Sequence, residues 1–385
     1  MTTKKSSSCV TQKKTSYLFH PYEIAFCGYS NSGKTTLISK LIKSLKSKYT
    51  IGYIKHDVHK FQMDKEGKDT FVSWNSGATQ ILISDSKHTA SIHKNSPDLI
   101  ESKTSFLNCD IAFLEGYKNS SAKKLVIIDQ ENKIFNAIKT GEIDHVIGFI
   151  GQGPKPQSLP LDLPYFQRDD IGSIAQWIQD FQIKRVKEIP LYGLVLAGGH
   201  STRMKKDKAL LKYSDKTQAE AGYELLSSFC ESTFISSRFN QWSNQTLNHL
   251  PQIHDRFLDF GPMGGILSAM QTHPHAAWLV IACDLPYLDK NTIQFLIKNR
   301  NPFKMASCYK SKNSDFPEPL CSIYEPKILL RLLQFLGLGY QCPRKVLIQS
   351  PTQLLEQPYK STLENINFND EYIKTKKQIE ARIVQ

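Results

Sequence analysis

The amino-acid sequence lacks any long apolar run, and this excludes several classes of protein. No stretch is long enough to cross a bilayer, and the first 20 residues have no apolar core of the kind found in secretory signals. We therefore expect a cytoplasmic protein that does not associate with membranes. The sequence also lacks paired cysteines: its eight cysteines form no Cys-x-x-Cys pair and accompany no histidine at zinc-finger spacing. Neither a disulfide framework nor a structural zinc site is expected.

Signatures of nucleic-acid binding are also missing, although the chain is strongly basic. The formal net charge is +13, but the lysines and arginines are spread along the chain with few aromatic neighbours. No helix-turn-helix, zinc-finger or RNP-like pattern accompanies them. We interpret the charge as a surface that attracts phosphates in general, and we expect no nucleic-acid partner. Residues 1–20, with four lysines among serines and threonines, predict a disordered basic arm.

With 385 residues, the chain is too long for one ordinary hydrophobic core, so two domains are expected. From residue 22 onward, short β-rich runs alternate with amphipathic helical stripes, a pattern typical of an α/β fold with a largely parallel sheet. A Pro- and Gly-rich segment at 151–164 precedes an amphipathic helix that closes the first domain. We place the boundary in the charged stretch 184–190, which gives domains at 21–183 and 190–385. The strands expected in the first domain are 23–27, 50–54, 80–84, 111–114, 125–129 and 145–150.

Residues 28–35 contain the most complete nucleotide-binding pattern of the first domain. They match GxxxxGK[ST] in full, follow an apolar strand and open an amphipathic helix. The glycines let backbone N–H groups turn around a β-phosphate at the positive end of the helix dipole. Lys34 can then reach the β- and γ-phosphates, and the Thr35 hydroxyl can bind Mg²⁺. The predicted site comprises Gly28, Ser30, Asn31, Ser32, Gly33, Lys34, Thr35 and Thr36.

Three other polar segments of this domain are less specific by themselves. Residues 55–57 (Lys-His-Asp) follow the second strand, and residues 64–70 form a polar loop with a glycine. Glu115 ends the strand 111–114, where a carboxylate can face the water shell of a bound metal. By pattern alone, each segment is as compatible with a solvated loop as with a site. Glu115 is kept as a candidate metal ligand beside Thr35.

Five segments of the first domain together carry a family resemblance. They are the P-loop, IKHDVH at 54–59, DKEGKDT at 64–70, SGATQ at 76–80 and FLEGYK at 113–118. On these segments, residues 20–182 resemble the MobB family, the P-loop accessory proteins of molybdopterin guanine dinucleotide synthesis. The resemblance implies GTP binding with at most weak hydrolysis, because Glu115 takes the place of the Asp that closes a typical Walker B strand.

Residues 194–211 are the most informative stretch of the second domain. An apolar strand runs into Gly198 and Gly199, so the backbone can approach a nucleotide closely and donate N–H groups to phosphates. Arg203 and Lys208 supply cations for a triphosphate whose α–β bridge must be broken. A flexible basic loop would share the double glycine but not the whole string LAGGHSTRMKKDK. These residues predict a second nucleotide site.

Two acidic residues further along the chain fit the same chemistry. Asp284 follows the apolar run 277–282, and a carboxylate at the C-terminal end of such a strand can hold Mg²⁺. Judged without its neighbours, Asp284 has an alternative interpretation as a turn or helix-cap residue. Asp255 precedes the turn 261–265 (Gly-Pro-Met-Gly-Gly). In an alternative interpretation, the glycines of this turn serve only to permit tight packing. Both aspartates are candidates for the site.

Five elements of the second domain carry another resemblance. They are the LAGG loop, GPMGG at 261–265, CDLP at 283–286, PEPLCSIYEP at 317–326 and ENIN at 364–367. On these elements, residues 190–385 resemble the MobA family of molybdenum cofactor guanylyltransferases. Lys205 departs from that family, which usually has Gly at this position. The family's polar strand-end position falls near Ser236 or Ser237.

This second resemblance implies roles for individual residues. Lys208 is expected to bind the phosphates, Asp255 the guanosine portion, and Asp284 both nucleotide and Mg²⁺. Gly199 favours guanine, because the cytosine-using relatives usually have Ala-Gly in place of Gly-Gly. The implied catalytic residues are Arg203, Lys208 and Asp284. The implied nucleotide-binding residues are Leu196, Ala197, Gly198, Gly199, Lys208, Asp255 and Asp284.

Together, the two resemblances imply a MobB–MobA fusion of two three-layer α/β domains. The first is expected to be P-loop NTPase-like, and the second a Rossmann-like nucleotidyltransferase of the nucleotide-diphospho-sugar transferase type. The implied reaction transfers GMP from GTP to molybdopterin or Mo-molybdopterin with Mg²⁺, forming molybdopterin guanine dinucleotide and pyrophosphate. Implied partners are molybdenum-inserting and molybdoenzyme-maturation proteins. Two alternatives stay open: a related transferase that uses CTP or a sugar phosphate, and a GTP-regulated carrier of the cofactor.

Overall fold

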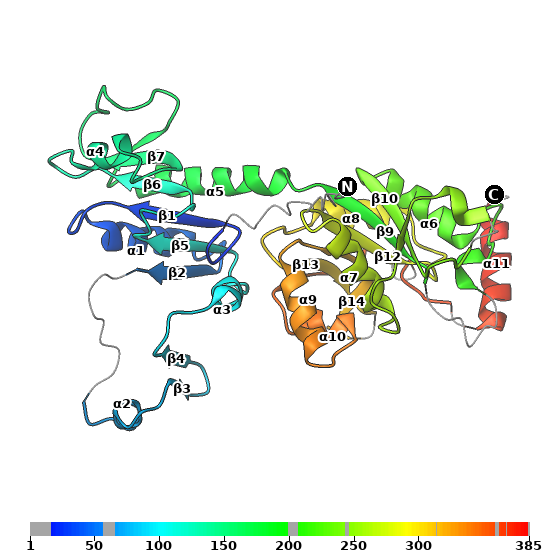
Figure 1. Cartoon of the computed structure of the whole chain (residues 1–385). Coiled ribbons are helices and arrows are strands. Elements are labelled where there is room, and N and C mark those ends of the chain that lie inside the picture. Colours follow the sequence, from blue (N-terminus) through cyan, green and yellow to red (C-terminus); the bar gives the residue numbers. More distant parts are fainter. Residues whose placement is uncertain are drawn as a thin grey trace, which may run out of the picture. The chain divides into compact units, whose positions relative to one another are not determined.

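The computed structural model describes residues 17–56, 66–198, 207–242, 246–312, 314–358, 362–366 and 368–383. Residue contacts divide the chain between Gln179 and Asp180 into two compact units, which are described one at a time (Figure 1). Helix α5 (Ile171–Lys187) runs through this division, and no proline interrupts it before Pro190. The domain boundary at 184–190 falls partly within this helix and stays a prediction. Within the described ranges, no helix is both long and apolar enough to span a bilayer.

A six-stranded parallel sheet forms the centre of the first unit, in the order β2-β5-β1-β6-β7-β8. Strands β1 and β5 are buried along their whole length, which explains why their sequences are almost continuously apolar. Five of the six predicted strands lie in this sheet with ends within two residues of the prediction, whereas β8 was not predicted. The strands are β1 (Glu23–Cys27), β2 (Ile51–Lys55), β5 (Ile111–Glu115), β6 (Lys124–Ile127), β7 (Val146–Gly151) and β8 (Tyr165–Gln167).

Helix α1 (Lys34–Leu45) packs on β1 and β5 and fixes the position of the loop before it. Its apolar residues recur at the spacing of one helix face, and four of them are buried: Leu37, Ile38, Leu41 and Leu45. Apart from α5, the other helices in the described part of the unit are shorter. They are α2 (Asp69–Asn75), α3 (Leu99–Thr104) and α4 (Ile134–Lys139).

Residues 17–20 differ from the disordered arm that the sequence predicts for 1–20. The backbone N–H groups of Leu18, Phe19 and His20 donate to the Glu23 carboxylate at 2.6, 2.8 and 3.1 Å. Glu23 and His20 are both buried. Residues 17–20 are therefore part of the first unit, because a buried carboxylate needs these donors. Residues 1–16 of the predicted arm lie outside the described residues.

The strand predicted at 80–84 is present, but it is not part of the main sheet. Strand β3 (Gln80–Ser84) pairs antiparallel with β4 (Thr89–His93) in a two-stranded sheet of its own. Asp85 closes the turn by accepting the backbone N–H groups of Lys87 and His88, each at 2.6 Å. A parallel neighbour would need a crossover of a dozen or more residues, whereas this short turn returns the chain at once. This strand therefore lies outside the parallel sheet.

The second unit has a mixed seven-stranded sheet in the order β11-β10-β9-β12-β14-β13-β15. Strands β11, β10, β9 and β12 run parallel, and β14 pairs antiparallel with both β12 and β13. The chain moves outward from β9 to β11 and then returns to the other side of β9, which makes β9 a switch point of the sheet. The strands are β9 (Leu191–Leu196), β10 (Ser232–Ser237), β11 (Gln252–His254), β12 (Ala277–Ala282), β13 (Ala306–Lys310), β14 (Pro317–Tyr324) and β15 (Thr352–Leu355).

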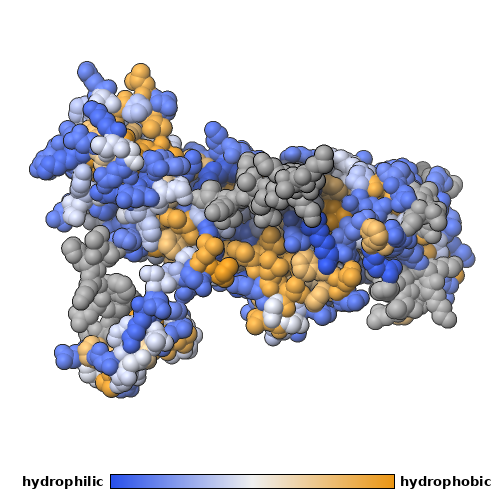
Figure 2. Space-filling view, in the orientation of Figure 1, coloured by the Kyte–Doolittle hydropathy of each residue, from blue (hydrophilic) through white to orange (hydrophobic). Residues whose placement is uncertain are grey.

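In the described residues after β9, six α-helices accompany this sheet. Helix α6 packs on β9 and β10, and α7 on β9 to β12. The space-filling view shows an apolar patch near α9 and α10 (Figure 2), where Leu333, Leu338, Tyr340 and Ile348 are exposed. The helices are α6 (Gln218–Ser227), α7 (Pro262–Thr272), α8 (Lys290–Lys298), α9 (Ile328–Gly337), α10 (Pro343–Ile348) and α11 (Asn369–Ile383).

Candidate functional site

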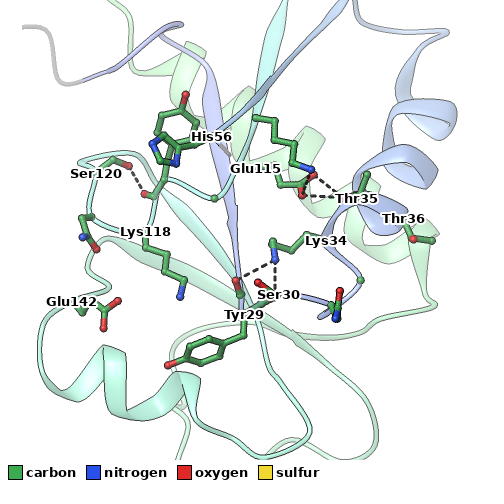
Figure 3. Close-up of a pocket in the computed structure, with 17 residues that line it drawn as sticks. Tyr29, Ser30, Lys34, Thr35, Thr36, His56, Glu115, Lys118, Ser120 and Glu142 are labelled. Atoms are coloured by element: carbon green, nitrogen blue, oxygen red, sulfur yellow. Dashed lines mark hydrogen bonds and ion pairs between the residues drawn. The ribbon is translucent and has the colours of Figure 1, made fainter. Parts of the chain in front are cut away.

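The phosphate loop of the first unit links β1 to α1 at the C-terminal edge of the sheet. Gly33 has the left-handed φ of 81° that favours glycine, and a Cβ at Gly28 would lie 2.7 Å from the Ser32 hydroxyl oxygen. A cavity of about 1080 Å³ opens in front of this loop (Figure 3). Of the eight predicted residues, Ser32 alone does not line it. The predicted residues that line it are Gly28, Ser30, Asn31, Gly33, Lys34, Thr35 and Thr36.

The Lys34 ammonium lies inside the loop. Its Nζ donates to the carbonyl oxygens of Gly28 and Tyr29 at 3.2 and 2.7 Å. Partial burial lowers the pKa of Lys34, and the nearby Glu115 carboxylate opposes this shift. The cation is therefore already placed where the terminal phosphates of a nucleotide are held in a P-loop.

Glu115 lies against the start of α1, although the two segments are 80 residues apart in sequence. Its two carboxylate oxygens accept the Thr35 hydroxyl at 2.8 and 3.0 Å. The Tyr53 hydroxyl donates to the same carboxylate at 2.6 Å, and burial together with this bond raises the pKa of Tyr53. Lys55 Nζ lies 3.8 Å from it. The structure thus brings the candidate metal ligands Thr35 and Glu115 together, and it adds Tyr53, which the sequence analysis missed.

The second site is a cavity of about 520 Å³ at the C-terminal ends of β9, β10 and β12. The register explains this convergence, because Leu196 at the end of β9 pairs with Ser236 on one side and Ala282 on the other. Gly199 and Arg203 lie outside the described residues. The predicted residues that line the cavity are Leu196, Ala197, Gly198, Lys208, Asp255 and Asp284.

Lys208 and Asp284 form a partly buried ion pair in this cavity. Lys208 Nζ lies 3.1 Å from Asp284 Oδ2, and about a fifth of each side chain is exposed. The other carboxylate oxygen, Oδ1, is buried and accepts no hydrogen bond from the described residues. The N-cap of the following helix α8 is Asp289, which accepts the Thr292 N–H, so Asp284 does not cap that helix. A carboxylate oxygen without a hydrogen bond, on a residue that lines a cavity, is suited to bind a cation.

Asp255 follows β11, whereas Asp284 follows β12, and these two strands lie on opposite sides of β10 and β9 in the sheet. Both aspartates line the same cavity. Asp255 Oδ1 accepts the Ser236 hydroxyl at 2.7 Å. Burial raises the pKa of Asp255, while the bond from Ser236 and the charges of His254 and Arg238 oppose that shift. A Cβ at residue 198 would lie 2.7 Å from Asp255 Oδ2, so only glycine lets the loop backbone approach this carboxylate.

The two serines at the end of β10, Ser236 and Ser237, have different surroundings. Ser236 lines the cavity, whereas the Ser237 hydroxyl donates to Gln252 at 2.7 Å. The sequence analysis missed the neighbouring Arg238 and Phe239, which also line the cavity. Their place directly after a strand was the only signal in the sequence that could have found them.

The glycines of the turn 261–265 serve two purposes. A Cβ at Gly264 would lie 2.3 Å from the Phe257 carbonyl oxygen, and one at Gly265 would lie 2.4 Å from the Ser236 hydroxyl oxygen. These two glycines permit α7 to pack tightly, as the alternative interpretation held. Gly261 and Pro262 line the cavity.

The phosphate loop of the first unit and the cavity at the switch point of the second sheet are features of nucleotide-binding α/β domains. Comparison with family models agrees. The model of molybdopterin guanine dinucleotide synthesis protein B (MobB) matches residues 23–150, and the model of the MobA-like NTP transferase domain matches residues 193–354. The chain thus carries a MobB-like domain followed by a MobA-like NTP transferase domain. This confirms the predicted resemblances and the α/β nucleotidyltransferase class.

Individual relatives match one part of the chain each. A molybdenum cofactor biosynthesis bifunctional protein of Synechocystis is 40% identical over 187 residues, which are 49% of this chain and 54% of that protein. A molybdopterin-guanine dinucleotide biosynthesis adapter protein of Haemophilus influenzae is 32% identical over 28% of this chain and 64% of its own length. A probable molybdenum cofactor guanylyltransferase of Clostridium perfringens is 27% identical over 46% of this chain and 92% of its own length. The chain therefore spans about half to two thirds of the length of the first two of these relatives.

Proposed function

We propose that this protein is a molybdenum cofactor guanylyltransferase with a fused GTP-binding domain. It transfers GMP from GTP to molybdopterin or Mo-molybdopterin and releases pyrophosphate. The observation that carries this proposal is the Lys208–Asp284 pair, with its unsatisfied Asp284 oxygen, in the cavity where three strands end. The names of the relatives that match the two halves of the chain support the choice of substrates.

The residues around the cavity have distinct proposed roles. The backbone of Leu196, Ala197 and Gly198 holds the nucleotide, because a strand end followed by glycine leaves N–H groups available for phosphates. The ionised Asp255 carboxylate accepts the N–H groups of guanine, since carboxylates are acceptors only. Lys208 stabilises the negative charge that develops on the phosphates. Gly199 and Arg203 belong to the same proposed site on sequence grounds.

Mg²⁺ fits the donors that both sites offer. Within the described residues, no group of three or more His, Cys, Asp or Glu side chains is placed to hold a metal. Mg²⁺ commonly binds through only one or two carboxylates together with substrate phosphates. Asp284 would hold the ion in the second unit, and Thr35 and Glu115 in the first. When bound, the ion would neutralise phosphate charge.

The proposed chemistry is a direct displacement. An oxygen of the terminal phosphate of molybdopterin attacks the α-phosphorus of GTP, the bond from that phosphorus to the bridging oxygen breaks, and pyrophosphate leaves. Cys283 also lines the cavity, but burial raises the pKa of its thiol to about 12, so it stays protonated and is a poor nucleophile. No covalent enzyme intermediate is therefore invoked.

One assay tests this proposal against the two alternatives. The full chain is incubated with molybdopterin, Mg²⁺ and each of the four nucleoside triphosphates, and pyrophosphate is measured. We expect release with GTP alone. Release of pyrophosphate with CTP, or in a parallel reaction with a sugar phosphate in place of molybdopterin, would favour the related transferase. The absence of pyrophosphate with every nucleotide would favour the carrier.

A further inference from the structure

We infer that the cavity of the first unit holds a second ligand, a phosphate monoester, next to the terminal phosphate of the nucleotide. This inference rests on the proposed nucleotide binding by the P-loop. It adds a binding site formed by Lys118 and its neighbours on the side of the loop away from α1.

The cavity is larger than the phosphate loop needs, and its lining has two parts. One part is the loop and the start of α1; the other comprises His56, residues 116–120 and Glu142. Because Lys34 Nζ contacts the carbonyl oxygens of residues 28 and 29, the terminal phosphate of a bound nucleotide lies near Tyr29. In Figure 3, Lys118 and Glu142 lie on the side of the loop opposite to Thr36. The second part of the cavity thus extends beyond the terminal phosphate.

Lys118 is the cation of this second part. Its Nζ lies 4.2 Å from the centre of the Tyr29 ring, which holds the ammonium over the loop by a cation–π contact. Among the described residues, no carboxylate forms an ion pair with Lys118. Lys34 and Lys118 both line this cavity, so the two ammonium groups act on the same space. Two nearby cations at one cavity favour an anion between or beside them.

The backbone before Lys118 adopts a conformation that is rare in loops. Gly116 and Tyr117 have φ values of +94° and +54°, and the second is a left-handed conformation unusual for a tyrosine. The Tyr117 ring is fixed edge-to-face by Phe19 and His56, each with ring centres 5.5 Å away. These contacts hold the turn that places Lys118 over the loop, and such conformations concentrate at ligand sites.

The remaining lining residues define what the rest of the ligand must offer. Asn119, Ser120 and the exposed Glu142 supply hydrogen-bond acceptors on the far side of the cavity. A ligand that satisfies both ends carries a phosphate for Lys118 and N–H or O–H donors for these acceptors. Molybdopterin, the acceptor of the proposed reaction, ends in a phosphate monoester and belongs to this class.

The test measures phosphate binding to the full chain after the nucleotide sites have been filled. The protein is saturated with Mg²⁺ and a non-hydrolysable GTP analogue, so that the γ-phosphate position is occupied, and radiolabelled inorganic phosphate is added in equilibrium dialysis. We expect at least one phosphate to bind. Lys118→Ala and Lys118→Gln should each weaken this binding tenfold or more, whereas the control Lys123→Ala, at an exposed lysine five residues away, should not. Glycerol 3-phosphate should compete with the label, and glycerol should not.

Each contrary result has a distinct meaning. If the analogue binds but no phosphate follows, if phosphate binding is unchanged in both Lys118 variants, or if glycerol 3-phosphate does not compete, the second-ligand site is refuted while nucleotide binding stands. The amount of bound labelled GTP analogue is therefore measured in the same dialysis chambers. If Lys34→Ala does not reduce the number of bound analogue molecules, the P-loop does not bind nucleotide, and both the inference and that part of the proposed function fail.

Discussion

Both sites of this chain contain a lysine and a carboxylate at the C-terminal edge of a sheet, but these side chains have different hydrogen-bond and ion-pair partners in the two sites. In the first unit, Lys34 donates to carbonyl oxygens of its own loop, and Glu115 accepts the hydroxyl groups of Thr35 and Tyr53. In the second unit, Lys208 pairs directly with Asp284, which keeps one buried oxygen unsatisfied. Both oxygens of the Glu115 carboxylate thus accept hydrogen bonds from their own unit, whereas Asp284 keeps a buried oxygen that calls for a partner.

The second difference concerns how each site is assembled. The phosphate loop of the first unit is made by consecutive residues between β1 and α1. The second cavity collects residues from the ends of three strands that are separated by tens of residues in sequence. We therefore expect the two sites to respond independently to substitution, and the following experiments test that expectation.

Asp284→Asn should have the largest effect on transfer. The substitution keeps the size of the side chain but removes the charge that pairs with Lys208 and would hold Mg²⁺. We expect guanylyl transfer to fall by about 10²-fold or more, as for the loss of a major electrostatic stabiliser, with the melting temperature nearly unchanged. Pyrophosphate release and thermal unfolding are measured on one preparation. Activity close to wild type at limiting Mg²⁺ would remove Asp284 from the site.

Lys34→Ala should separate the two units. Loss of the ammonium inside the loop should weaken nucleotide binding by the first unit by about 10²-fold, because charge-assisted contacts to two phosphates are lost. Guanylyl transfer should stay within about twofold, since the second cavity has its own cation. The exposed Lys43→Ala is the control for nucleotide binding. A parallel loss of transfer would show that the sites are coupled.

Tyr53→Phe should have an intermediate effect that is confined to the first unit. It removes the 2.6 Å hydrogen bond to Glu115 and leaves the ring in place. We expect about tenfold weaker Mg²⁺-dependent nucleotide binding, in line with about 1.4 kcal/mol for one bond to a charged group. The readout is nucleotide affinity as a function of Mg²⁺ concentration. An identical Mg²⁺ dependence in variant and wild type would contradict a positioning role for Tyr53.

The smallest effect expected is a shifted pH dependence of GTP binding by the second unit. Because burial raises the pKa of Asp255, the ionised form that accepts guanine N–H groups is lost at a higher pH than for an ordinary aspartate as the solution is acidified. For stability the sign is opposite: the protonated group favours the folded state at low pH, and this contribution is lost as pH rises through the raised pKa. GTP affinity is measured across acidic pH in the Lys34→Ala protein. Asp255→Asn should bind more weakly and without this titration, and an unchanged profile would exclude Asp255.

The sequence by itself determined the features that are local. The P-loop was predicted in full because eight consecutive residues encode both the turn and the start of α1. Most strands of the first sheet were found because buried parallel strands are written as continuous apolar runs. The strand end at Asp284 was found for the same reason.

Only the tertiary structure decided which distant residues meet. The pairing of β2, β5 and β1 brings Tyr53 and Glu115 to the Thr35 hydroxyl, and the pairing of β10 and β11 brings Ser236 to Asp255. The structure also separated β3 and β4 from the parallel sheet, although β3 was correctly predicted as a strand. Strand pairing depends on contacts between segments far apart in the chain, and a single sequence encodes the tendency to form a strand but not its neighbour.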